Sequence, residues 1–213
     1  MKNTCIIRHL GIRDYREILE KMQLFTKTRN DDTTDEIWFL EHPQIFTQGQ
    51  AGKSKHILKP SNIAIIQSDR GGQVTYHGPG QLIIYFLLDI RRKSFTIRDL
   101  VSKFEQIIID LLANYEITAH RKNKAPGVYI NDEKICSLGI RVRKGCCYHG
   151  LSLNIDMDLT PYQFINPCGY DGLTVTQLKT YLPNLEDNKI NAEILKLIQK
   201  HLQYATNKDM IYP

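Results

Sequence analysis

The segment Gln81–Ile90 is the feature that most constrains the fold of this chain. It is an almost continuous run of Ile, Leu, Tyr and Phe. Because alternate side chains of a strand point to opposite faces of a sheet, such a run predicts a central strand buried on both faces. The chain has 213 residues, a length that suits one domain, and we expect residues 1–213 to form it.

Amphipathic helices and short strands are predicted around this segment. Residues 14–29 carry apolar side chains at helical spacing, and a stronger helix begins at Thr96, with Asp99 placed for a variant of the capping box. A last helix is predicted over Ala192–Tyr204. Further strands are predicted at Ile37–Leu40, Ile63–Gln67, Val128–Ile130, Ile135–Val142 and Cys147–Ile155. A loop is predicted after Leu40 through Gly52, and a turn at 131–133.

Helices separated by clusters of hairpins predict an α+β fold, or an α/β fold with a mixed sheet. Five cysteines, an odd number, argue against a disulfide framework and for a reducing compartment. Neither a signal peptide nor a membrane-spanning run is visible, so we expect a cytoplasmic protein without a membrane partner. The net charge of +5 favours acidic partners. Nucleic acid is disfavoured, because no basic stripe is interleaved with aromatic residues.

The stretch Asn166–Tyr170, which reads Asn-Pro-Cys-Gly-Tyr, points to chemistry at Cys168. Pro167 fixes its own φ and lacks an N–H, and Gly169 reaches backbone angles closed to other residues. A thiol between them is expected on a fixed loop with little bulk beside it, the kind of place where nucleophiles lie. The alternative is a buried structural cysteine.

Arg70–Gln81 holds four glycines and a proline around a short strand that ends at His77. Glycines of this kind let a backbone approach a ligand and present N–H groups to it. A β-hairpin with its turn at 78–80 is the simpler interpretation, but it leaves Arg70-Gly71-Gly72 unexplained. We therefore expect substrate contact in this segment.

Phosphate-loop and metal motifs are not supported. Gly49–Ser54 has the ending of a phosphate loop, but Thr47 stands where that loop needs glycine. Cys146 and Cys147 are adjacent on a predicted strand and point to opposite faces, so we expect no metal site there.

Two further residues have an ordinary interpretation and a functional one. His149 either shapes a site or is a common core or surface histidine. Lys134, at the end of a tight turn, is either solvated or stabilises a thiolate and moves a proton if it lies beside a thiol. Sequence spacing does not show whether Lys134 and Cys168 meet.

Four blocks, in this order along the chain, together resemble the octanoyl (lipoyl) transferases of bacteria and mitochondria. They are Arg70–Gln81, Gly127–Arg141, His149–Asn154 and Asn166–Tyr170. These acyltransferases move an octanoyl group from acyl carrier protein to a lysine of lipoyl domains, a step of lipoate biosynthesis and protein lipoylation. The resemblance implies a fold like that of lipoate–protein ligases and of the catalytic domain of biotin–protein ligases. This is an α+β (two-layer α/β) fold with a mixed, largely antiparallel sheet flanked by helices.

The resemblance also implies the site. Cys168 matches the nucleophile, Lys134 its partner, and His149 is an auxiliary residue. Residues implied to bind substrate are Arg70, Gly71, Gly72, Gln73, Val74, Thr75, Tyr76, His77, Ser137, Leu138, Gly139, Gly150, Leu151 and Ser152.

The implied reaction passes the acyl group through a Cys168 thioester without ATP. No cofactor is implied, because the phosphopantetheine arm arrives with the donor, octanoyl-acyl carrier protein. The implied acceptors are the lipoyl domains of 2-oxoacid dehydrogenases and the glycine cleavage H protein, and we expect the enzyme to be a monomer.

Within that reaction, backbone N–H groups near Leu138 and Gly139 are candidates to hold the oxyanion. Side chains expected to line an acyl tunnel are Val74, Tyr76, Leu138 and Leu151. A Cys168–His77 base pair is an alternative to the pair with Lys134. Two rivals remain for the whole chain: an ATP-dependent lipoate–protein ligase, which needs no nucleophilic cysteine, and a non-catalytic binding module for acidic partners.

Overall fold

The computed structural model describes residues 4–184 and 187–207, and in this part of the chain an eight-stranded sheet forms the centre of the molecule. Its strand order is β11-β1-β2-β6-β10-β9-β8-β7. The pairing of β1 with β2 and β11 is parallel, and every other pair is antiparallel, which confirms the predicted mixed sheet. The strands are β1 (Thr4–Ile12), β2 (Asp35–Glu41), β6 (Gln81–Asp89), β7 (His120–Lys122), β8 (Ala125–Ile130), β9 (Glu133–Arg143), β10 (Cys146–Asn154) and β11 (Ala205–Asn207).

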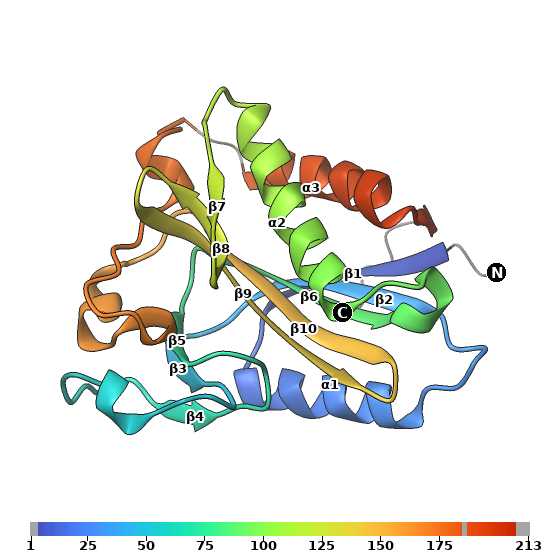
Figure 1. The fold of residues 1–213 in the computed structure, drawn as a ribbon, viewed down its shortest axis with the longest axis horizontal. Coiled ribbons are helices and arrows are strands. Elements are labelled where there is room, and N and C mark those ends of the chain that lie inside the picture. Colours follow the sequence, from blue (N-terminus) through green and yellow to red (C-terminus); the bar gives the residue numbers. More distant parts are fainter. Residues whose placement is uncertain (1–3, 185–186, 208–213) are drawn as a thin grey trace.

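Helices flank this sheet on both faces, as Figure 1 shows. Helix α1 (Tyr15–Thr28) packs against β6 and β10 on one face. Helices α2 (Ile97–Ala113) and α3 (Asp187–Leu202) pack against each other over the opposite face. The expected α+β class is therefore confirmed, whereas helices on both faces of the sheet make three layers and not the expected two.

Strand β6 is the buried centre that its apolar run predicts. All of its residues are buried. Ile84 and Phe86 point into the core beneath α2 and α3, whereas Ile83 and Tyr85 point into the cluster beneath α1. Full burial of such a side chain contributes about 1.5–3 kcal/mol, so this strand is a main source of the cohesion between the layers.

The helix starts follow local hydrogen-bonding signals. Asp14 accepts hydrogen bonds from the first turn of α1, and Thr96 and Asp99 form the predicted capping box at the start of α2. The last helix begins at Asp187, before the predicted Ala192, and ends at Leu202. Its first turn includes the fully buried Ile190, which lies four residues before Ile194 and continues the helical spacing of the predicted segment toward the N-terminus.

A second sheet of three strands, in the order β4-β3-β5, lies beside the main sheet. Its strands are β3 (Ile45–Gln48), β4 (Ile65–Gln67) and β5 (Val74–His77), and β3 forms inside the segment predicted as a loop. The Gln81 N–H donates to the Gly78 carbonyl at 3.1 Å, so the predicted turn exists. The alternative interpretation as a β-hairpin is nevertheless wrong, because β5 pairs with β3 and β6 pairs with β2 and β10. The turn instead carries the chain from one sheet to the other.

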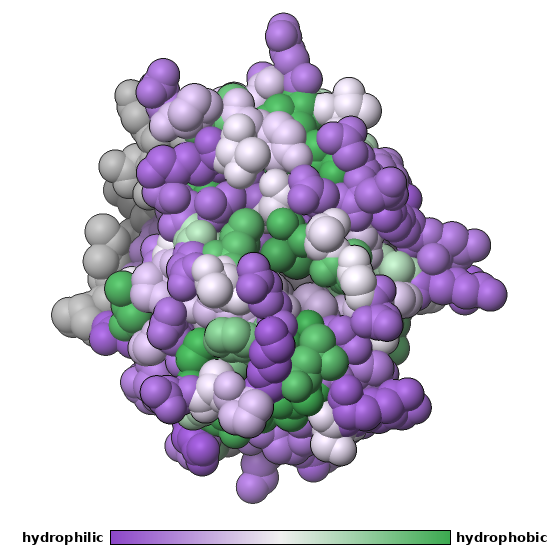
Figure 2. Space-filling view, turned by 90° about the vertical axis from the view of Figure 1, so that its left-hand side faces the viewer, coloured by the Kyte–Doolittle hydropathy of each residue, from purple (hydrophilic) through white to green (hydrophobic). Residues whose placement is uncertain are grey.

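The surface is mostly hydrophilic on the face drawn in Figure 2, where hydrophobic side chains gather near the centre and hydrophilic ones surround them. Within residues 4–184 and 187–207, none of the helices is both long enough and apolar enough to cross a membrane.

Candidate active site

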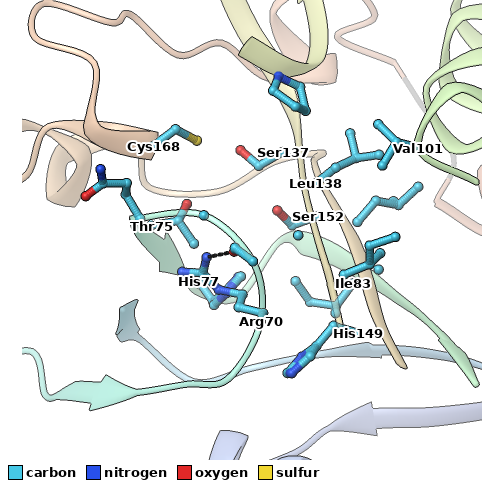
Figure 3. A pocket seen from close by; sticks show the side chains of 18 of the residues that line it. Arg70, Thr75, His77, Ile83, Val101, Ser137, Leu138, His149, Ser152 and Cys168 are labelled. Carbon is cyan, nitrogen blue, oxygen red and sulfur yellow. Dashed lines mark hydrogen bonds between the residues drawn. The ribbon is translucent and has the colours of Figure 1, made fainter. Parts of the chain in front are cut away.

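A cavity of about 300 Å³ lies where the two sheets, α2 and the loop that carries Cys168 come together (Figure 3). Its volume is at the lower end of the range of about 300–1,000 Å³ typical of small-molecule sites. The expected residues that line it are Arg70, Gly71, Gly72, Gln73, Thr75, His77, Ser137, Leu138, Gly139, His149, Gly150, Leu151, Ser152 and Cys168. The sequence blocks singled out above therefore converge on one site.

Cys168 lies in a short 3-10 turn over Pro167–Gly169. Its own backbone is left-handed, with φ 57° and ψ 13°, a conformation that costs about 1–2 kcal/mol for a residue with a Cβ. Two hydrogen bonds hold this turn, from the Gly169 N–H to Asn166 O at 2.9 Å and from the Tyr170 N–H to Pro167 O at 3.1 Å. The thiol is half-buried, whereas the other cysteines are buried. The loop placement expected from the sequence is thus present.

Lys134 reaches Cys168 from β9. Its side chain is buried, and Nζ donates to the Cys168 Sγ at 3.1 Å and to Pro126 O at 3.0 Å. Gly127 leaves room for this amine: a Cβ there would come within 2.8 Å of Lys134 Cε, and its φ of +141° suits glycine. The two residues implied as a catalytic pair, 34 positions apart in sequence, are therefore in contact.

The charge on Lys134 depends on this contact. Burial lowers the pKa of Lys134, but the neighbouring Cys168 sulfur and the Tyr129 phenol raise the pKa more, and the net shift is upward. The Nζ atom also lies 5.3 Å from the centre of the Tyr129 ring, within cation–π range. These neighbours favour an ammonium at neutral pH.

Thr75 presents a free hydroxyl to the cavity. Its side chain is buried, its Oγ1 has no hydrogen-bond partner among the described residues, and in Figure 3 the hydroxyl points toward the end that holds Cys168. The nearby Tyr162 hydroxyl is already bonded to Gln81 Nε2 and to Tyr76 O. Gln73 Oε1 also lacks a partner within the described chain. Because unpaired buried polar atoms are costly, both groups are suited to bind a ligand.

Arg70 and His77 are bonded into the protein. The Arg70 guanidinium donates to the side chain and carbonyl of Thr47 and to Gly71 O. His77 Nδ1 pairs with Gln81 Oε1 at 2.7 Å, and Nε2 pairs with Thr47 Oγ1 at 3.2 Å. Burial lowers the pKa of His77. Since both ring nitrogens have these partners, the alternative Cys168–His77 base pair does not form.

His149 also lines the cavity, with a buried side chain and a left-handed backbone at φ 60°. Its Nε2 pairs with Asp69 Oδ1 at 2.8 Å. Burial raises the pKa of Asp69, but hydrogen bonds from His149 and Tyr148 outweigh it and lower this pKa to about 2. Burial lowers the pKa of His149 itself. A carboxylate only accepts, so Nε2 carries the proton and Nδ1, which has no partner in the described chain, is an acceptor.

Two expected lining residues point elsewhere. Val74 and Tyr76 belong to a separate core cluster with Phe46 and Tyr162, so the expectation that they line the acyl tunnel is wrong. Alternation along β5 explains this, because Thr75 and His77 face the cavity and their neighbours must face away. Lining residues that the sequence analysis did not assign to the site are Ile83, Tyr85, Val101, Pro126, Ile140 and Tyr170. Alternation along the Gln81–Ile90 strand, combined with the position of the cavity, would have indicated the first two.

Metal-binding side chains do not cluster in the described part of the chain. Residues 4–184 and 187–207 contain no group of three or more His, Cys, Asp or Glu residues that could hold a metal ion. Cys146 and Cys147 make separate contacts, to Lys144 O and Phe86 O.

Comparison with known sequences links this geometry to a family. The profile of the lipoyl protein ligase A/B catalytic domain matches residues 14–199. An octanoyltransferase of Pseudomonas putida KT2440 is 52% identical over 206 residues, covering 96% of this chain and 95% of the relative. An octanoyltransferase of Shewanella sp. MR-7 is 59% identical over 180 residues, covering 84% of this chain and 83% of the relative.

Solved structures share the fold at low identity. A lipoate-protein ligase A bound with ATP superposes with a TM-score of 0.79 and 12% identity, covering 100% of this chain and 90% of the ligase. The biotin protein ligase of Aquifex aeolicus has a TM-score of 0.54 and 13% identity, covering 95% of this chain and 70% of the ligase. The expected fold relationship to both kinds of ligase is thus confirmed.

Proposed function

This chain belongs to the lipoyl protein ligase A/B catalytic-domain family and is an acyltransferase of the octanoyltransferase group, and from that premise we propose that it transfers octanoyl groups to lipoyl domains through a thioester on Cys168. The observation that carries the proposal is the 3.1 Å contact between Cys168 Sγ and Lys134 Nζ at a cavity with apolar walls. An ammonium in contact with a sulfur favours the thiolate, which is the nucleophilic form.

In the first half-reaction, the Cys168 thiolate attacks the carbonyl carbon of the octanoyl thioester on acyl carrier protein. The new S–C bond forms as the bond to the phosphopantetheine sulfur breaks. The departing sulfur takes a proton from the Lys134 ammonium, which becomes a neutral amine. One thioester replaces another, so the step needs neither ATP nor a cofactor.

In the second half-reaction, the amine of the target lysine attacks the acyl-Cys168 carbonyl. The amide forms, Cys168 leaves as a thiolate, and the amine proton passes to Lys134. Acylation makes this proton transfer possible: the charged sulfur, which raises the pKa of Lys134, is gone, and the burial that lowers this pKa remains. The amide product then dissociates, and the ion pair between the Cys168 thiolate and the Lys134 ammonium is restored.

The cavity supports an octanoyl substrate. Ile83, Val101, Leu138 and Leu151 supply apolar contacts for the tail. Each buried methylene contributes about 0.8 kcal/mol. The Thr75 hydroxyl and backbone N–H groups near Leu138 and Gly139 are the proposed donors to the oxyanion of the tetrahedral intermediate.

Acidic proteins are the proposed partners, with octanoyl-acyl carrier protein as donor and, as acceptors, the lipoyl domains of 2-oxoacid dehydrogenases and the glycine cleavage H protein. The net charge of +5 supports docking of acidic domains. Because exposed charges are screened by salt, transfer should slow as ionic strength rises.

The test is incubation with octanoyl-acyl carrier protein in the absence of nucleotide, followed by intact-mass analysis. We expect one octanoyl adduct per chain, which hydroxylamine removes and which Cys168→Ala abolishes. Cys146→Ala is the matched control and should keep the adduct. An adduct or product that forms only with ATP and free octanoate would instead establish the ligase reaction, and absence of any adduct on Cys168 would reject the thioester route.

A further inference from the structure

Behind Lys134 lies a buried carboxylate that the proposed mechanism does not yet use. Glu105 is the one charged residue among the buried residues of α2, a helix that lies wholly in the described chain. Its Oε1 accepts the Gly127 N–H at 2.9 Å, and its Oε2 pairs with Arg121 Nε at 3.0 Å. A buried carboxylate on an otherwise apolar helix face costs free energy unless it is paired. The two contacts offset this cost, and the role of a carboxylate at this position needs an explanation.

The contact with Gly127 leads directly to the reacting sulfur. The Gly127 N–H and the Pro126 carbonyl belong to one planar peptide unit. The Pro126 oxygen accepts from Lys134 Nζ at 3.0 Å, and Nζ donates to Cys168 Sγ at 3.1 Å. An unbroken chain of hydrogen bonds therefore runs from a carboxylate through a peptide and an ammonium to the thiol.

We propose that Glu105 is a positioning residue, which holds the 126–127 peptide so that Pro126 O keeps the Lys134 ammonium on the Cys168 sulfur. A carboxylate that accepts from one side of a peptide polarises its carbonyl on the other side, and this strengthens the bond to Nζ. Glu105 acts on the ion pair through this peptide, whose N–H its carboxylate accepts. The inference rests on the proposed function of Lys134 and Cys168.

Other charged and titratable groups border this chain of hydrogen bonds. Lys122 Nζ lies 4.7 Å from the centre of the Tyr129 ring, and the His120 ring stacks on that of Tyr129. Cys168 and the Tyr129 phenol lie beside Lys134. Arg121 pairs with the second oxygen of Glu105. Burial raises the pKa of the Cys136 thiol, and the nearby charges of Lys134 and Glu105 respectively lower and raise this pKa. Arg121 pairs with Oε2 of Glu105, so Oε1 remains directed at the Gly127 N–H.

The experiment measures the second-order rate of Cys168 alkylation by iodoacetamide from pH 5 to pH 10, with peptide mapping to separate Cys168 from the buried cysteines. In Glu105→Met, which removes both acceptors, we expect alkylation at pH 7 to slow about three- to tenfold. Glu105→Gln keeps one acceptor oxygen for two donors and should fall between Glu105→Met and the wild type. Asp110→Asn is the control. It removes a carboxylate of the same helix that pairs with Lys200 and His201 of α3, and it should leave the alkylation profile of Cys168 unchanged.

The decisive comparison repeats Glu105→Met in a Lys134→Met background. If Glu105 acts through Lys134, adding Glu105→Met to the Lys134→Met variant changes the alkylation rate by less than about twofold. An equal slowing in both backgrounds, or a wild-type profile in Glu105→Met, overturns the inference about Glu105. Should Glu105→Met not fold, the same two-background comparison is made with Glu105→Gln. Equal alkylation of the wild type and Lys134→Met would instead reject the proposed ion pair itself, so the two failures are distinguishable.

Discussion

At one end of the cavity, the Cys168 sulfur and the Lys134 ammonium meet each other, and the Thr75 hydroxyl points toward them without a partner in the described chain. At the other end, polar side chains are bonded to the protein: Arg70 to Thr47 and Gly71, and His149 to Asp69. Figure 3 shows Cys168 and His149 at opposite ends of the view. The Thr75 hydroxyl, which faces the reacting atoms, is left free for substrate, whereas Arg70 and the His149–Asp69 pair fix the wall at the far end, although His149 Nδ1 also lacks a partner within the described chain.

This difference separates two kinds of expected effect. Substitutions at the Cys168 end should change the reactivity of the sulfur. Substitutions at the far end should change stability or substrate fit and leave the sulfur unaffected. The predictions below test that division.

Cys168→Ala should have the largest effect. Transfer of octanoyl to a lipoyl domain should fall by about a thousandfold or more, because no other group replaces the nucleophile. Product formation measured by mass spectrometry of the acceptor checks this. Residual transfer within about tenfold of the wild type would remove Cys168 from the reaction.

Lys134→Met should reduce transfer by about 10²–10⁴-fold, the usual contribution of a positioned acid and base. Alkylation of Cys168 at neutral pH should slow as well, because the ammonium that favours the thiolate is gone. Stopped-flow alkylation and single-turnover transfer measure the two effects separately. His149→Gln, at the far end, is the comparison variant; a loss in alkylation rate as large as that of Lys134→Met would contradict the division between the two ends.

Asp69→Asn should change acid stability and leave Cys168 alkylation near the wild-type rate. The pKa of Asp69 is lowered from 3.8 to about 2 on folding, so its contribution is present above pH 4 and is lost as the pH falls through 2. Between pH 5 and pH 2, the free energy of unfolding of the wild type should decrease by about 1–2 kcal/mol more than that of Asp69→Asn. Urea unfolding at the two pH values measures this, with Asp171→Asn, at an exposed position, as the matched control.

Shortening the acyl tail of the donor should give the smallest change in kcat/KM per substitution. Each methylene removed from the octanoyl donor should lower kcat/KM about fourfold, which corresponds to about 0.8 kcal/mol. Val101→Phe, which narrows the apolar wall, should penalise octanoyl more than hexanoyl donors. Ile97→Phe, on an exposed position of the same helix, should not change this ratio. Equal effects of Val101→Phe on both donors would place the tail elsewhere.

The sequence predicts the core of the fold better than its edges. The Gln81–Ile90 run, the Thr96–Asp99 capping box and the helix at 14–29 each carry a local signal that the tertiary structure follows. The strands β1, β3, β7 and β11 were not predicted. Each of these is short or mixed in composition and depends on a distant partner, as β1 does on β2 and β11.

The site divides in the same way. Residue types and their order indicate the blocks that line the cavity, and the family resemblance implies the pair of Cys168 and Lys134. The 3.1 Å contact itself depends on how β9 packs against a loop far along the chain, which spacing does not encode. The sidedness of Val74 and Tyr76 was missed because it depends on the pairing of β5 with β3 in a separate sheet.

The left-handed backbone at Cys168 limits which residues can serve as the attacking group. At a φ of 57°, a side chain branched at Cβ is strongly disfavoured, so threonine cannot replace the thiol without distorting the turn. Serine fits the same space but offers an alcohol where the neighbouring amine suits a thiol. The shape of the loop therefore restricts alternative nucleophiles before any question of their intrinsic reactivity arises.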